Sequence, residues 1–216
     1  EAFAGQLLAE WDDWRRADRF DAAAPLATIY FGGGTPSRLS PGALGRIIER
    51  VTADRPLAPG AEVTLEANPE DVTPVAARAW VAAGVNRVSL GVQSFDPAVL
   101  TWMHRTHTEA DVPRAVATLR AAGIANLTLD LIYALPEALK RDWDRDLDQA
   151  LTLAPDHLSL YGLTVEPRTP LGRWVERGAA LPSPEERYAG EFLLAHQRLG
   201  AAGFEHYEVS NYARPG

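Results

Sequence analysis

The sequence predicts an α/β protein in which helices flank a largely parallel sheet. Short runs rich in β-branched and aromatic residues alternate with longer helical patterns. Three similar segments, "AAGV" (82–85), "AAGI" (121–124) and "AAGF" (201–204), each end a helical pattern and begin a strand pattern. Glycine adopts the left-handed backbone just past a helix end at little cost, so these segments mark helix ends. The repeated order of strand, helix, glycine and strand indicates parallel strands joined by right-handed crossovers.

Six segments have the composition of strands, and residue pairs mark where several helices begin. The predicted strands are 28–31, 62–67, 87–92, 126–133, 157–164 and 206–210. An N-cap residue precedes proline at Ser40-Pro41, Thr73-Pro74 and Ser183-Pro184, and Ser183 and Glu186 have the spacing of a capping box. This rhythm fits both a closed or nearly closed α/β barrel and an open doubly wound sheet.

Composition restricts the class of protein. The 216 residues are 46% hydrophobic and 23% charged, which is enough for a sizeable core, and we expect one domain over residues 1–216. The net charge of −8 without a basic block argues against nucleic-acid binding. No apolar run approaches the roughly 18 residues of a transmembrane segment, and no signal-peptide pattern opens the chain, so we expect a cytoplasmic protein. Without cysteine, these residues form no disulfide and no thiolate metal site.

Polar residues gather where the predicted strands end, which is where α/β proteins place their chemistry. The first strand ends in "GGGT", the second in "EANP" and the third in "GVQS". Asp130 lies inside an otherwise apolar strand, where a carboxylate needs a partner or a function. Tyr161 and Thr164 end the fifth strand. Convergence of these groups predicts a ligand pocket.

The glycine run at 32–34 does not match the common phosphate-binding loops. No Gly-Lys-Ser/Thr follows it, and Ser37 stands where the last glycine of a dinucleotide-binding motif belongs. The polar set suits a ligand with an amino group, a carboxylate and ribose hydroxyls. Glycine carbonyls accept from an ammonium, Arg105 pairs with a carboxylate, and Glu66 and Asp130 accept from hydroxyls or an ammonium. S-adenosylmethionine carries all of these groups.

The histidines do not predict a metal site. His104 and His107 are three residues apart, but the neighbouring sequence reads as an exposed loop. His206 is interpreted as a structural histidine near the carboxyl ends of the strands. No G-x-S-x-G nucleophile motif is present, and we assign no catalytic residue.

Five motifs, taken together and in order, are typical of one family. They are "YFGGGTPS", "EANPE", "RVSLGVQSF" followed by "HRTHT", "LDLIYALP" and "YEVSNYARPG". With them the chain resembles the radical S-adenosylmethionine proteins of the coproporphyrinogen III dehydrogenase group, and more closely their HemW-type heme chaperone branch. The resemblance implies an incomplete parallel (β/α)6 barrel of the TIM type. It also implies that S-adenosylmethionine contacts Gly33, Gly34, Thr35, Glu66, Gln93, Arg105, Asp130 and, with a looser match, Thr164.

Two features favour the heme chaperone branch. Ser94 stands where oxygen-independent coproporphyrinogen oxidases tend to have Asp, and "YEVSN" (207–211) also differs from those enzymes. The resemblance therefore implies a protein that binds heme or a porphyrin and passes heme to respiratory proteins. Two alternatives stay open: oxidative decarboxylation of coproporphyrinogen III, and a cluster-free module that only binds S-adenosylmethionine. Whether the protein is an enzyme is left open as well.

The chain also departs from the family pattern. The family's C-x-x-x-C-x-x-C loop, which ligates a [4Fe–4S] cluster, is absent from these residues, as is its "HNxxYW" motif. We therefore expect a fragment that lacks the first strand, the cluster loop and the C-terminal region. Ala134 replaces the glycine usual in the family at that position, which tightens one loop.

Overall fold

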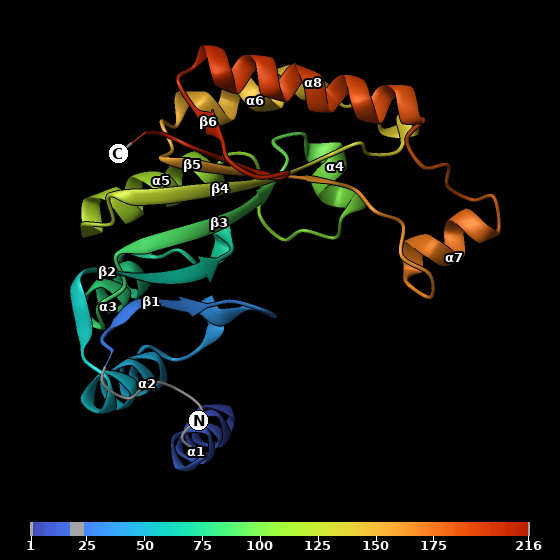
Figure 1. Cartoon of the computed structure of the whole chain (residues 1–216). Helices are drawn as coiled ribbons and strands as arrows, with labels where there is room; N and C mark the ends of the chain where they lie inside the picture. Colours follow the sequence, from blue (N-terminus) through green and yellow to red (C-terminus); the bar gives the residue numbers. More distant parts are fainter. Residues whose placement is uncertain (1, 18–23, 216) are drawn as a thin grey trace. The chain divides into compact units, whose positions relative to one another are not determined.

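The computed structural model describes residues 2–17 and 24–215, and its strands hydrogen-bond in the order β1-β2-β3-β4-β5-β7-β6 (Figure 1). The strands are β1 (Leu26–Phe31), β2 (Leu57–Ala67), β3 (Arg87–Gln93), β4 (Asn126–Tyr133), β5 (His157–Gly162), β6 (Glu205–His206) and β7 (Asn211–Ala213). The helices are α1 (Ala2–Arg16), α2 (Pro41–Asp54), α3 (Pro74–Ala82), α4 (Pro97–Trp102), α5 (Asp111–Ala122), α6 (Trp143–Thr152), α7 (Pro170–Glu176) and α8 (Glu185–Ala201). Short 3-10 turns follow β1 (Pro36–Arg38), β2 (Pro69–Asp71) and β4 (Glu137–Leu139).

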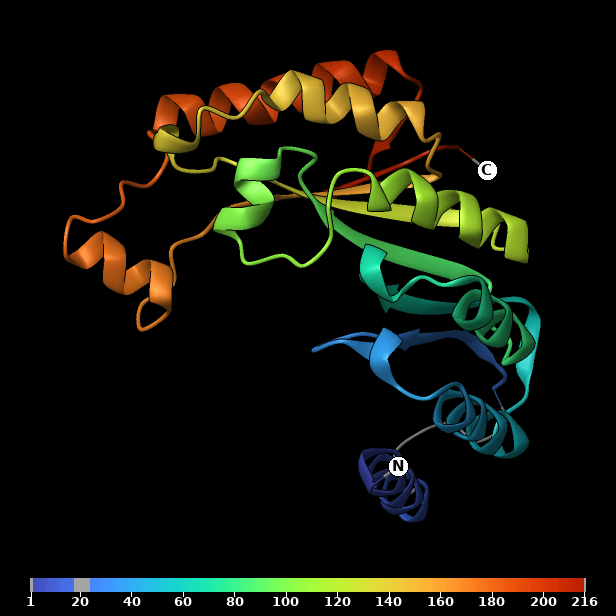
Figure 2. The same ribbon diagram turned by 180° about the vertical axis from the view of Figure 1, so that it is seen from behind.

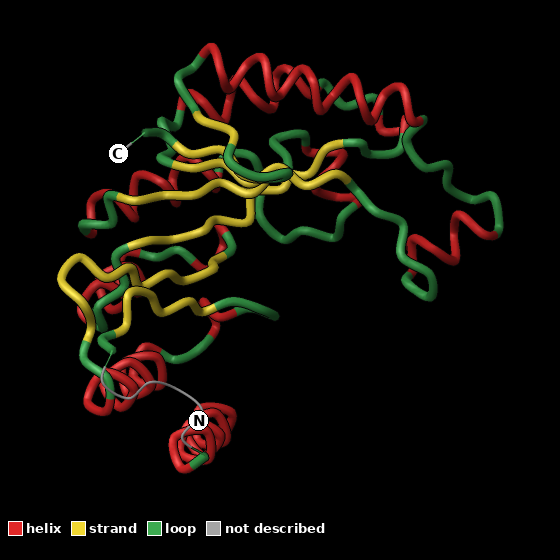
Figure 3. The backbone as a smooth tube through the Cα atoms, in the orientation of Figure 1, coloured by secondary structure: helices red, strands yellow, loops and turns green. Residues whose placement is uncertain are grey.

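The first five predicted strands are confirmed, whereas the sixth, at 206–210, is wrong. β1 pairs parallel with β2, and β4 pairs parallel with β5. In place of one further strand, β6 and β7 flank a turn that can be followed in Figure 3, and β7 runs antiparallel to both β5 and β6. Glu208 accepts a hydrogen bond from the Ser210 N–H at 2.8 Å, and this local contact stabilises the turn against an extended strand. β5 also ends at Gly162, two residues earlier than predicted.

Most of the predicted helix boundaries are confirmed. Ser40 and Thr73 accept hydrogen bonds from the backbone N–H three residues later and cap α2 and α3. The capping box at Ser183 is wrong, because α8 begins at Glu185 and the Ser183 hydroxyl donates to a carbonyl instead. The glycines that follow α3, α5 and α8 have φ values of 104°, 106° and 84°, as expected of the left-handed residue after a helix.

The chain divides into two compact units, which are described one at a time. The first unit comprises Glu1–Ser89 and Ala115–Asn126. Its core includes Val63, Leu65 and Ala67 of β2, which are buried. Phe31 of β1 packs with α1 and α2 around a small apolar cluster. That cluster contains Ala4, Ala43 and Ile47, with Leu7, Leu8, Leu39 and Val51 at its margin.

The second unit comprises Leu90–Arg114 and Leu127–Gly216. Leu129 and Leu131 of β4 and Leu158 and Leu160 of β5 are almost fully buried. α6 and α8 lie side by side, as both ribbon views show (Figures 1 and 2). Arg198 of α8 forms ion pairs with two aspartates of α6, and the Trp143 indole N–H donates to the Glu191 carbonyl at 3.0 Å.

A search for membrane-spanning helices in residues 2–17 and 24–215 finds none that is long and apolar enough.

Candidate functional site

In the first unit, the glycine loop after β1 is fastened to the end of β2. Glu66 receives two hydrogen bonds: the Gly33 N–H donates to Oε2 at 3.0 Å, and the Tyr30 hydroxyl donates to Oε1 at 2.8 Å. Tyr30 lies opposite Thr64 in the parallel register, so its side chain and that of Glu66 project from the same face of the two strands. Glu66 therefore positions the glycine loop directly.

The loop backbone is unusual at two consecutive residues. Gly33 and Gly34 have φ values of 80° and 64°, a conformation that side-chain-bearing residues adopt at a cost. A Cβ atom added at either position would meet no atom within 4 Å. The glycines are thus required by backbone conformation, and the space beside them is open to a ligand. Thr35 follows and precedes the 3-10 turn Pro36–Arg38.

A second contact joins the same two loops. The Ser37 hydroxyl donates to Asp71 Oδ2 at 2.7 Å, and it links the 3-10 turn after the glycines to the 3-10 turn after β2. Ser37 is buried, so this bond is shielded from solvent. The glycine loop is therefore held at both of its ends.

In the second unit, one face of the strands is polar and the other is aliphatic. Thr128 lies opposite His157 and Asp130 lies opposite Ser159, and these residues alternate with buried leucines. Since successive side chains point to opposite faces, Asp130 belongs to the polar face. The carboxylate predicted from the sequence therefore lies on the face away from the aliphatic core of this unit.

Arg105 contacts the backbone of β3 close to the end of that strand. Gln93 is the last residue of β3 and has a φ of 66°. The Arg105 guanidinium donates from Nη2 to the Gly91 carbonyl at 3.1 Å, and His107 Nε2 lies 3.1 Å from the Val92 carbonyl. His107 is buried, so it is a structural residue of this loop.

Thr164 is less constrained than the other predicted residues. It is exposed in the segment after β5, with its hydroxyl 3.5 Å from the Gly162 carbonyl. The preceding residue, Leu163, donates its N–H to the Tyr133 carbonyl at 2.9 Å, so Thr164 follows the ends of β4 and β5.

Among the predicted residues, the structure joins the glycine loop to Glu66 through the Gly33 N–H. In the second unit, Arg105 contacts the β3 backbone two residues before Gln93, whereas Asp130 lies on β4 and Thr164 follows β5. Their role as cofactor contacts stays a prediction. In the part of the chain that the structure describes, no three histidine or carboxylate side chains gather to hold a metal ion.

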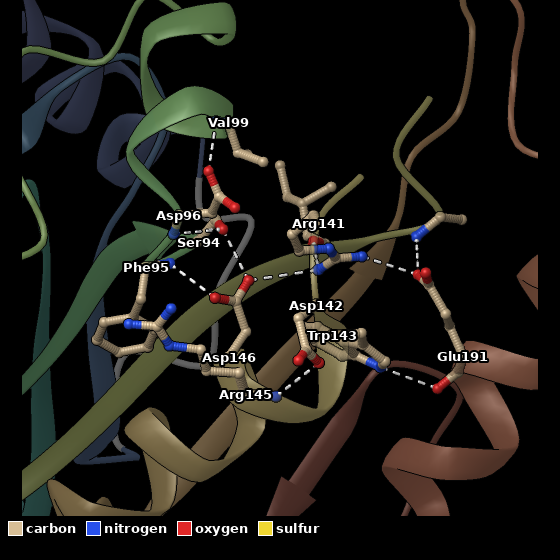
Figure 4. A network of polar contacts seen from close by, with 12 residues as sticks. Ser94, Phe95, Asp96, Val99, Arg141, Asp142, Trp143, Arg145, Asp146 and Glu191 are labelled. Carbon is tan, nitrogen blue, oxygen red and sulfur yellow. Dashed lines mark hydrogen bonds and ion pairs between the residues drawn. The ribbon is translucent and has the colours of Figure 1, made fainter. Parts of the chain in front are cut away.

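The second unit also contains a buried network of charged residues, drawn in Figure 4. The Arg141 side chain is fully buried and lies between two carboxylates, with Nη2 2.8 Å from Glu191 Oε2 and Nη1 3.4 Å from Asp146 Oδ2. Arg187 donates from Nε to Glu191 Oε1 at 2.8 Å, so the network has two positive and two negative groups.

Burial shifts the pKa values in this network. It raises the pKa of Asp146, against the opposing effects of hydrogen bonds from Ser94 and the Phe95 N–H and of the Arg141 charge. Burial also lowers the pKa of Arg141, against the attraction of Glu191 and Asp146. Desolvation is therefore the larger effect at both residues.

Sequence reasoning missed Tyr30 and this network. A signal for the network was present, because Asp146 falls between Trp143, Leu147 and Ala150, which form the buried stripe of α6. Glu191 likewise precedes the buried Ala195 and Leu199 at helical spacing. A carboxylate on the apolar stripe of a helix indicates a buried polar partner.

We predict that Gly33→Ala destabilises the chain by ~1–2 kcal/mol, since an alanine must adopt the left-handed backbone. Urea unfolding measures this change. Gly190→Ala is the matched control, because Gly190 lies within α8 with open space around its Cβ position. The control is expected to stabilise the chain by roughly 0.5–1 kcal/mol. Equal effects at both positions would contradict the role assigned to the loop backbone.

A second prediction concerns the pH dependence of stability that arises from Asp146. Because burial raises the pKa of Asp146 above its ordinary 3.8, its ionisation favours the unfolded chain. Its contribution to stability is present below pH 3.8 and is lost as the pH rises through the folded-state pKa. Asp146→Asn removes this titration. The free energy of unfolding of the wild type, relative to the variant, should therefore increase as the pH falls from 7 to 4. Urea titrations at several pH values test this, and parallel profiles would refute it.

The chain is similar in sequence to two heme chaperones. The chain is 40% identical over 192 residues to the heme chaperone HemW of Synechocystis, covering 89% of this chain and 47% of that protein. It is 42% identical over 191 residues to the heme chaperone HemW of Escherichia coli, covering 88% and 50%. The chain spans about half the length of the curated relatives it matches.

Solved structures confirm the predicted fold. Coproporphyrinogen III oxidase (HemN) from Escherichia coli, a radical SAM enzyme, aligns with a TM-score of 0.80 at 24% identity, over 98% of this chain and 49% of that one. The archaeal Elp3 of Methanocaldococcus infernus aligns with a TM-score of 0.63 at 18% identity, over 88% and 47%. Residues 14–150 match the radical SAM superfamily, and the chain belongs to that superfamily.

Proposed function

We propose that this chain is the S-adenosylmethionine-binding core of a protein that binds heme and passes it to respiratory proteins in the cytoplasm. The observation that supports the cofactor is the glycine loop, with its open space at Gly33 and Gly34 and its tie to Glu66. The heme function rests on the heme chaperones that are 40% and 42% identical over nearly nine tenths of this chain.

Each unit, taken by itself, carries groups whose chemistry suits S-adenosylmethionine. In the first unit, the backbone carbonyls of the glycine loop suit an ammonium, which Glu66 attracts further through its charge. In the second unit, Asp130 suits the ribose hydroxyls, and Arg105, which donates to the Gly91 carbonyl, suits the carboxylate. A [4Fe–4S] cluster with S-adenosylmethionine supplies radical chemistry in this superfamily. Its thiolate ligands would come from outside these 216 residues, which contain no cysteine.

Ser94, the residue that separates the two branches of the group, has a defined role here. Its side chain is fully buried and donates to Asp146 Oδ2 at 2.7 Å. An aspartate at position 94 would place a second carboxylate beside Asp146 and raise the cost of burying both. Ser94 is therefore matched to Asp146 in this chain. Serine stands here where the oxidases tend to have Asp, and this difference favours the heme chaperone.

The two activities differ in their products. We expect the longest native form of the protein, reconstituted anaerobically with iron and sulfide, to retain heme through gel filtration and transfer it to apo-cytochrome acceptors. We also expect no loss of carbon dioxide from coproporphyrinogen III, because transfer of heme leaves the propionate side chains of the porphyrin unchanged. Porphyrinogen products are measured by mass spectrometry in the same samples. Decarboxylation with S-adenosylmethionine turnover, and no heme transfer, would overturn the proposal in favour of the oxidase.

A further inference from the structure

Two residues with a left-handed backbone lie at the ends of neighbouring strands of the second unit. Gln93 ends β3 with a φ of 66°, and Ala134 follows β4 with a φ of 57°. Neither is a glycine, so each conformation is strained and persists only where the surroundings fix it. Strain of this kind concentrates at functional sites.

Each strained turn is fixed by a carboxylate from a helix. Asp146 of α6 accepts from the Ser94 hydroxyl at 2.7 Å and from the Phe95 N–H at 3.0 Å, directly after Gln93. Glu191 of α8 accepts from the Ala134 N–H itself at 2.7 Å. The two turns therefore have the same kind of support from different helices.

Arg141 connects the two supports. It donates to the carboxylates of both Asp146 and Glu191, and its Nη1 also donates to the Ile132 carbonyl of β4 at 3.1 Å (Figure 4). The side chains of Arg141, Asp146 and Glu191 are 0%, 3% and 10% exposed. A disturbance at either carboxylate thus changes the environment of the one cation that both share.

A buried ion network is a poor source of stability, because desolvation offsets most of the attraction between its charges. Its value lies in fixing one geometry. We propose that Asp146, Arg141 and Glu191 form a positioning triad that couples the turn after β3 to the turn after β4. The triad holds Gln93 and the end of β4 in the conformation that binds S-adenosylmethionine. The identity of that ligand rests on the function proposed above; the coupling of the two turns does not.

Hydrogen–deuterium exchange on the full chain tests the coupling. Ser94→Ala removes the hydroxyl that donates to Asp146 and accepts from the Asp96 N–H within the β3 turn. Glu191→Gln weakens the support of the β4 turn. The triad predicts that each variant accelerates exchange at both turns, 93–96 and 133–135, by roughly 5- to 100-fold. Glu185→Gln, an exposed residue of the same helix α8, is the control and should leave both turns unchanged. Acceleration confined to the mutated turn would overturn the proposal.

A rescue variant separates positioning from general loss of packing. Ala134→Gly removes the strain at position 134, because glycine adopts a positive φ at little cost. If Glu191 serves to hold this turn, Ala134→Gly should restore most of the exchange protection lost in Glu191→Gln. Failure to restore it would show that Glu191 acts through packing alone, against the triad.

The affinity for S-adenosylmethionine provides the second readout. It is measured by calorimetry without urea, at a pH where every variant is folded. The triad predicts a dissociation constant raised by roughly tenfold in Ser94→Ala and unchanged in Glu185→Gln. An unchanged constant in Ser94→Ala would contradict the positioning role. If the wild type itself binds no S-adenosylmethionine, the proposed function fails, and the exchange experiment alone decides on the coupling.

Discussion

The alternation of side chains along in-register parallel strands is the constraint on which this structure depends. Leu129 and Leu131 of β4 lie opposite Leu158 and Leu160 of β5 and form an aliphatic face. The residues between them necessarily face the other way, so the same register that builds the core presents Asp130 on the polar face. A slip of one residue would bury that carboxylate and expose the leucines. In the second unit, the aliphatic core and the direction of Asp130 are therefore fixed by a single register.

Polar groups at strand ends need a further means of support, because a strand specifies the direction of a side chain but not the course of the loop that follows. The chain uses carboxylates for this purpose in both units. Glu66 holds the glycine loop in the first unit, while Asp146 and Glu191 hold the turns after β3 and β4 in the second. In each case a carboxylate accepts a backbone N–H from a residue with positive φ or from one within two residues of it. At Gln93 and Ala134, which are not glycines, this hydrogen bonding supports a conformation that is otherwise strained.

Much of the fold could be predicted because it follows from local rules. The glycines after α3, α5 and α8 and the caps at Ser40 and Thr73 depend only on neighbouring residues, and they were predicted correctly. The structure of residues 206–210 was predicted wrongly. The turn between β6 and β7 depends on a hydrogen bond from the Ser210 N–H to Glu208, which competes with strand pairing. The network around Arg141 was missed for a related reason. Arg141 and Glu191 are 50 residues apart along the chain, and Ser94 and Asp146 are 52 residues apart. No local sequence pattern brings residues this far apart together.

The most direct measurement of the central claim is the affinity of the chain for S-adenosylmethionine with the Glu66 charge removed. In Glu66→Gln, the amide oxygen still accepts from Gly33 and the amide nitrogen donates to the Tyr30 hydroxyl, so the loop keeps its support. Glu49→Gln on the exposed side of α2 is the control. The account predicts a dissociation constant raised by on the order of tenfold for Glu66→Gln, because the attraction between the Glu66 carboxylate and the ammonium of the cofactor is lost. It predicts no change for Glu49→Gln. Equal affinity in the wild type and both variants would show that the glycine loop does not hold the cofactor.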